Sequence, residues 1–85
     1  DFSHGNCQKQ HRRQLDVCDD ICQQIRAGST QVAGVMVESF IAEGTQKIVP
    51  GTPLTYGQSI TDPCLSWDDS ETLLARLADA VESRL

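Results

Sequence analysis

Residues 31–37 constrain the fold of this chain more than any other segment, because they form an apolar run that does not alternate with polar residues. The run, Gln31–Val37, stops abruptly at Glu38. A strand with one face in water would alternate, so this pattern is typical of a parallel strand buried on both faces. Parallel strands are joined by crossover connections, usually helices.

A helix is predicted on the N-terminal side of this strand, from Gln8 to Arg26. Its apolar residues follow helical spacing and form one stripe, made of Leu15, Cys18, Cys22 and Ile25. Gly28 supplies the permissive turn that ends the helix. Asp1–Ser3 are interpreted as the end of an earlier strand.

The segment from Phe40 to Asp62 is predicted to be a long loop with short extended pieces at 54–56 and 58–60. Its breakers exclude a long helix, and they are Gly44, Pro50, Gly51, Pro53 and Gly57. A loop of this length in a compact domain is usually functional.

A second helix is predicted to begin near Trp67, with Asp68 as its N-cap and Glu71 as the partner in a capping box. Its apolar face is predicted to consist of Leu73, Leu74, Leu77, Val81 and Leu85. The predicted order is therefore strand end, helix, strand, long loop and helix.

This order predicts an α/β fold with a right-handed crossover in one domain, residues 1–85. Two strands and two helices do not close a parallel sheet, and a complete (β/α)8 TIM barrel takes about 250 residues. We therefore expect the chain to be the C-terminal third of such a barrel rather than a closed barrel. The first residues also lack an initiator Met and the pattern of a signal peptide, which favours a piece of a larger protein.

Charge and cysteine content exclude several classes of protein. The chain has 12 acidic and 7 basic side chains, a net charge of −5, which argues against nucleic acid or an anionic membrane as a partner. No apolar run approaches the roughly 20 residues of a membrane span.

Cys18 and Cys22 lie on the helical stripe and are interpreted as small core residues. A metal site at this pair is the weaker alternative, because it lacks the C-x2-C units of structural zinc sites. These features predict a reduced, cytoplasmic protein.

Three polar residues follow the predicted strand ends. His4 follows Phe2-Ser3, Glu38 follows the apolar run, and Asp62 follows Ile60-Thr61. The carboxyl ends of the strands of an α/β barrel share one rim, which carries the chemistry. An imidazole and two carboxylates meeting there would suit a divalent metal with an open position. The alternatives are a structural histidine, an ion pair between Glu38 and an arginine, and an ordinary turn at Asp62.

Three motifs, in order and with matching spacing, resemble the type I 3-deoxy-D-arabino-heptulosonate 7-phosphate (DAHP) synthases. The first is Asp1–Asn6, the second Gly34–Ser39 followed by Glu43–Gln46, and the third Tyr56–Cys64. The resemblance covers nearly the whole chain.

The resemblance implies a metal-dependent transferase of the shikimate pathway, which supplies chorismate for aromatic amino acid biosynthesis. Such an enzyme condenses phosphoenolpyruvate with erythrose 4-phosphate and releases phosphate. The family's metal, expected here as Mn, Fe, Co or Zn, has Cys, His, Glu and Asp ligands. By motif position, His4, Glu38 and Asp62 correspond to the His, Glu and Asp ligands. None of the four cysteines of this chain lies in the motif that supplies the Cys ligand. Asp62 is also expected to contact the hydroxyls of the aldose as a catalytic residue.

Without the remaining ligand and the phosphoenolpyruvate site, we expect the 85-residue chain alone to be inactive. We also expect a homo-oligomer, or association with the missing part of the barrel. Two alternatives remain open at this point. One is the related 3-deoxy-octulosonate 8-phosphate synthase, which the third motif disfavours. The other is a non-catalytic module that associates with itself through the exposed edges of an unclosed sheet.

Overall fold

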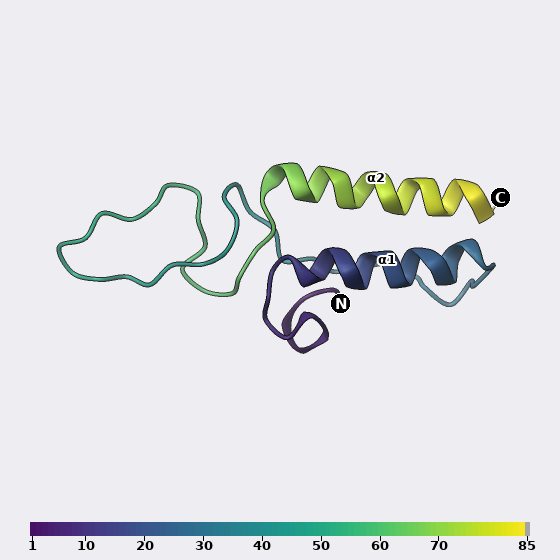
Figure 1. The fold of residues 1–85 in the computed structure, drawn as a ribbon, viewed down its shortest axis with the longest axis horizontal. Helices are drawn as coiled ribbons and strands as arrows, with labels where there is room; N and C mark the ends of the chain where they lie inside the picture. Colours follow the sequence, from purple (N-terminus) through teal and green to yellow (C-terminus); the bar gives the residue numbers. More distant parts are fainter. Residues whose placement is uncertain (85) are drawn as a thin grey trace.

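A computed structural model describes residues 1–84 of the chain. A short 3-10 helix, η1 (His4–Cys7), is followed by the α-helices α1 (Arg13–Arg26) and α2 (Trp67–Arg84). The two α-helices lie side by side and run in the same direction, and the long loop between them projects beyond their N-terminal ends (Figure 1). The molecule is accordingly elongated, with extents of 54 × 22 × 17 Å.

The strands predicted from Asp1–Ser3 and Gln31–Val37 are not formed in residues 1–84. The two segments are joined by one backbone hydrogen bond, from Phe2 N to Met36 O at 2.9 Å. Met36 is 51% exposed, so the prediction of a strand buried on both faces is wrong for this chain. A central parallel strand needs a hydrogen-bonded neighbour on each side, and the described residues do not supply them. The part described here therefore contains neither a sheet nor a barrel.

Helix α1 begins five residues later than predicted. Gln8 and Lys9 have positive φ angles of 55° and 56°, which no α-helix accommodates. The end of the helix is predicted correctly, since Gly28 has a φ of 101° and donates its N–H to Ile25 O at 2.9 Å.

The core lies between the two helices and includes both thiols of α1. Cys18 and Cys22 are buried, with their Sγ atoms 3.8 Å apart, and both are free. Burial raises the pKa of Cys18 to about 12, with a further contribution from Cys22, so the Cys18 thiol stays protonated at neutral pH. Their interpretation as small core residues is confirmed. The other buried apolar residues of this core are Phe2, Ile25, Leu65, Leu73 and Ala80.

The start and the buried face of α2 differ from the prediction. Ser66 is the N-cap in place of Asp68, because its Oγ accepts the N–H of Asp69 at 3.1 Å. Glu71 accepts the indole N–H of Trp67 at 2.6 Å and takes no part in a capping box.

The helix turns Leu73, Leu77 and Ala80 toward the core. Leu74 is 62% exposed, and Val81 is also exposed. The predicted face is thus only partly correct, because the packing against α1 selects one of two adjacent apolar stripes. Leu85 lies outside the described residues.

The long loop is braced across its width although it contains no regular strand. Gly44 N donates to Cys64 O at 2.8 Å, and Cys64 N donates to Gly44 O at 3.1 Å. Further out, the side-chain amide of Gln46 donates to the carbonyls of Thr55 and Gln58 and accepts the N–H of Thr55. These bonds tie the two sides of the loop to each other.

Among residues 1–84, neither helix combines the length and the apolar character that crossing a membrane requires.

Candidate metal centre

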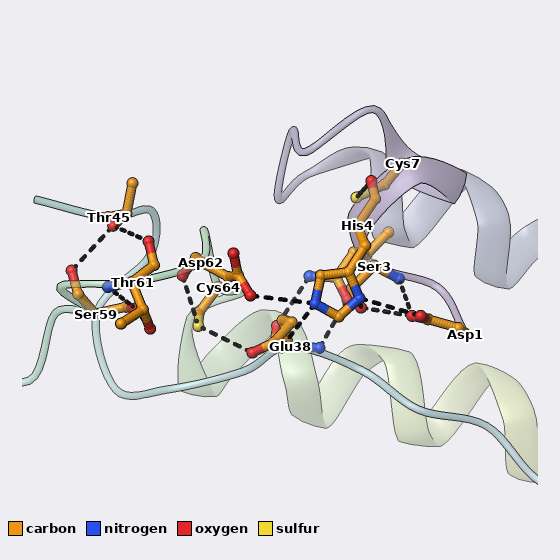
Figure 2. Close-up of polar contacts among 11 residues, drawn as sticks. Asp1, Ser3, His4, Cys7, Glu38, Thr45, Ser59, Thr61, Asp62 and Cys64 are labelled. Atoms are coloured by element: carbon orange, nitrogen blue, oxygen red, sulfur yellow. Dashed lines mark hydrogen bonds and ion pairs between the residues drawn. The ribbon is translucent and has the colours of Figure 1, made fainter.

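His4, Glu38 and Asp62 come together at the base of the long loop, although they are far apart in the sequence. Each offers one ligand atom, and these three atoms all lie within 4.8 Å of one another. His4 Nε2 is 3.2 Å from Glu38 Oε1 and 3.2 Å from Asp62 Oδ2. Figure 2 shows the imidazole pointing toward both carboxylates. The structure therefore brings together the three residues that the strand-end argument selected.

The ring of His4 is oriented from its other side by Asp1 and Ser3. Its Nδ1 lies 3.1 Å from Asp1 Oδ2 and 2.9 Å from Ser3 Oγ. With a metal bound at Nε2, the ring proton would lie on Nδ1, where the carboxylate of Asp1 would accept it. His4 also has a φ of 57°, a strained conformation of the kind that is concentrated at functional sites.

Glu38 is fixed through its backbone. Leu65 N donates to Glu38 O at 2.9 Å, within an isolated parallel bridge between Ser39 and Leu65. The amide of Gln14 makes two further hydrogen bonds to the backbone of Glu38. The carboxylate is half-buried, and among residues 1–84 it faces the imidazole of His4 at 3.2 Å rather than an arginine.

Thr45 and Cys64 fix the backbone around Asp62. Thr45 Oγ1 donates to Thr61 O at 2.7 Å and fixes the backbone beside Asp62. Cys64 Sγ donates to Asp62 O at 3.3 Å and lies 3.9 Å from Glu38 Oε2. Burial raises the pKa of the Cys64 thiol, and the carboxylates of Glu38 and Asp62 raise it further. The thiol therefore acts as a hydrogen-bond donor to the site at neutral pH.

The donor set fits a divalent transition metal. One imidazole and two carboxylates suit Zn and the Mn to Co series, and three protein ligands leave a position open. The side chains of His4, Glu38 and Asp62 are all partly exposed, at 33–47%, so the group is accessible from one side. The cysteine pair of α1 belongs to no such group in the described part of the chain.

Two residues of the site were missed from the sequence. Gln14 lies one turn before Cys18 on the buried stripe of α1. A polar residue at a position of the buried stripe was the signal that could have identified it. Asp1 was assigned to a strand end, and its spacing from His4, three residues later, carried no recognisable motif.

A family model described as the DAHP synthetase I family matches residues 1–75. The chain belongs to this family. The family prediction made from the three motifs is therefore confirmed.

Individual members of the family match nearly the whole chain. The Trp-sensitive phospho-2-dehydro-3-deoxyheptonate aldolase of Salmonella typhi is 77% identical over 84 residues, which are 99% of this chain and 24% of that protein. The Trp-sensitive enzyme of Escherichia coli K12 is 74% identical over the same number of residues and the same shares. The solved structure of the aldolase from Francisella tularensis is 46% identical, with a TM-score of 0.92, and the match covers 99% of this chain and 24% of that one.

The chain thus spans about a quarter of the length of these family members, less than the predicted third. The TM-score with the Francisella structure means that the parallel helix pair and its loop have the arrangement found in part of a larger member of the family.

Proposed function

We propose that this chain carries three metal ligands of a DAHP synthase, His4, Glu38 and Asp62, inside a (β/α)8 barrel. The observation that carries the proposal is the convergence of these three side chains within 4.8 Å. Membership of the DAHP synthetase I family supports it. Because the chain spans about a quarter of the length of its relatives, the fourth ligand and most of the substrate contacts would come from the rest of the enzyme.

The proposed reaction is the condensation of phosphoenolpyruvate with erythrose 4-phosphate, with release of phosphate, as the first step of the shikimate pathway. The relatives are named as phospho-2-dehydro-3-deoxyheptonate aldolases, which favours this reaction over that of an octulosonate synthase. A divalent ion held at the site would supply Lewis-acid polarisation of the aldehyde of the aldose.

The residues of this chain have distinct proposed roles in that reaction. His4 would present Nε2 as a neutral nitrogen ligand, with its proton on the opposite nitrogen accepted by Asp1. Glu38 contributes an anionic ligand from a fixed backbone. Asp62 has the most exposed side chain of the three, at 47%, which places it best to contact the aldose hydroxyls as well.

The four free thiols are consistent with a reducing compartment, and we propose the cytoplasm as the location.

The decisive experiment is a chimera in which this chain replaces the matching 84 residues of the Salmonella typhi relative. We expect the chimera to form DAHP from both substrates and to contain one divalent metal ion per subunit. His4→Ala should remove most of the bound metal and reduce the activity at least 100-fold, since a centre without its metal ion has no Lewis acid.

Two controls accompany this chimera. The isolated 85-residue chain should form no product, because it carries only part of the proposed centre. Asp62→Asn should raise the Michaelis constant for the aldose as well as weaken the binding of the metal. A His4→Ala chimera that keeps its metal and its activity would contradict the proposed centre.

A further inference from the structure

Gln14 has the only polar side chain on the buried stripe of α1, and it is 0% exposed. Within residues 1–84, its side chain hydrogen-bonds to the backbone of Glu38 and not to the side chain of a candidate ligand. We infer that Gln14 is a positioning residue, which fixes the backbone of the metal ligand Glu38. The inference rests on the proposed metal centre and goes beyond it, because it assigns a role to a residue outside the ligand set.

The contact consists of two hydrogen bonds to the same residue. Gln14 Nε2 donates to Glu38 O at 2.9 Å, and Glu38 N donates to Gln14 Oε1 at 2.9 Å. The amide thus pairs with both backbone groups of Glu38, as a hydrogen-bonded residue on an antiparallel strand would. The Glu38 carbonyl also accepts from Leu65 N, so two separate elements hold this one peptide position.

Glu38 lies at the end of a segment that makes few backbone contacts of its own. The preceding segment, Gln31–Val37, forms no strand in the described residues and is mostly exposed. Among residues 1–84, Glu38 is therefore held by contacts from outside this segment, from Gln14 and from Leu65 N. Gln14 instead connects Glu38 directly to α1, the helix that follows the His4 segment.

The burial of a polar amide at this position supports the same conclusion. A buried amide loses its hydration, and this cost is offset only when its hydrogen bonds are made within the protein. The other buried residues of the stripe are Cys18, Cys22 and Ile25, so an apolar side chain would satisfy the packing at residue 14. What an apolar side chain would not supply is the pair of bonds to Glu38.

The consequence for the metal is geometric. A metal site tolerates deviations of only about 0.2 Å in its ligand distances. Loss of a contact that orients a ligand typically weakens metal binding by about 10- to 100-fold. We therefore expect Gln14→Met, which keeps the length of the side chain but removes both hydrogen bonds, to weaken metal binding by such a factor.

The test is a titration of the metal-free chimera with Co²⁺, whose visible absorption spectrum reports the number and geometry of its ligands. The parent chimera is compared with Gln14→Met and with the matched control Ile25→Val, which alters the same buried stripe far from Glu38. Thermal unfolding of the metal-free proteins shows whether each variant is folded. If Gln14→Met does not fold, Gln14→Asn replaces it, because the shorter amide does not span both backbone groups of Glu38.

We expect the Gln14 variant to have an altered Co²⁺ spectrum and a dissociation constant raised about 10- to 100-fold, with Ile25→Val unchanged. An unchanged dissociation constant in a folded Gln14 variant would overturn the inference. Equal weakening in Ile25→Val would also overturn it, because it would indicate a general effect of packing. The His4→Ala chimera distinguishes the two levels: if it binds Co²⁺ as the parent does, the proposed centre itself is wrong.

Discussion

The two nitrogens of His4 have different neighbours, and this asymmetry carries the first prediction. Nδ1 faces the carboxylate of Asp1 at 3.1 Å, whereas Nε2 faces Glu38 and Asp62. In Asp1→Asn the side chain keeps its shape but no longer supplies an anion to hold the proton on Nδ1. We expect Co²⁺ binding to the chimera to weaken about 10-fold, because a carboxylate behind a histidine ligand raises its basicity and fixes its ring.

Asp16→Asn is the matched control for this prediction, since Asp16 is an exposed carboxylate in the first turn of α1. The titration should distinguish the two variants. Equal affinities for Co²⁺ in both would show that the contribution of Asp1 is no more than that of any nearby negative charge.

The sequence predicted the three residues that converge at the candidate site but not the residues that contact them from behind. His4, Glu38 and Asp62 each follow a segment with strand-like composition, and strand ends in a parallel fold lie at one rim. Gln14 and Asp1 act through bonds to a distant backbone and to one ring nitrogen. Such bonds depend on the folded positions of both partners, and no local spacing in the sequence encodes them.

At the scale of the elements, the helices were predicted better than the strands for a physical reason. A helix satisfies its backbone hydrogen bonds within its own segment, so its periodic stripe is visible in the sequence. A parallel strand satisfies them with neighbours that other parts of the chain must supply. The Gln31–Val37 run has the composition of a buried strand but lacks those neighbours in residues 1–84.

The start of α2 gives a prediction at this scale. Ser66 Oγ accepts the N–H of Asp69. The first N–H groups of a helix have no carbonyl partner within the helix, so this bond satisfies one of them. Ser66→Ala should destabilise the first turn by about 1 kcal/mol. That free energy corresponds to about a 5-fold change in a local opening equilibrium. Amide hydrogen exchange at Asp69 in the chimera should therefore be about 5-fold faster.

Asp68→Ala is the control for the N-cap, because the sequence favoured Asp68 for that role. This variant leaves the bond from Asp69 to Ser66 in place, so exchange at Asp69 should change less than in Ser66→Ala. The reverse order of effects would restore Asp68 as the residue that begins the helix.

At the scale of the whole molecule, the chain leaves large apolar side chains in contact with water. They occur on the unpaired segment around Met36, along the outer stripe of α2 and in the long loop. A small chain buries a limited share of its apolar surface, and contiguous exposed patches mark surfaces that other parts of a protein cover. In the proposed synthase, the rest of the barrel would cover the Met36 segment.

The isolated chain has no such cover, so we expect it to associate with itself at micromolar concentrations. Association should occur through the segment around Met36, where apolar side chains lie beside backbone groups without strand neighbours. Sedimentation velocity should detect oligomers both with and without a metal chelator, because the contact does not involve the candidate metal ligands.

Met36→Lys should lower the mean mass by placing a charge on the associating edge. Ile48→Lys, at a loop position that is 65% exposed, should leave it unchanged. A monomer, or oligomers that dissociate when metal is removed, would contradict this surface as the site of association.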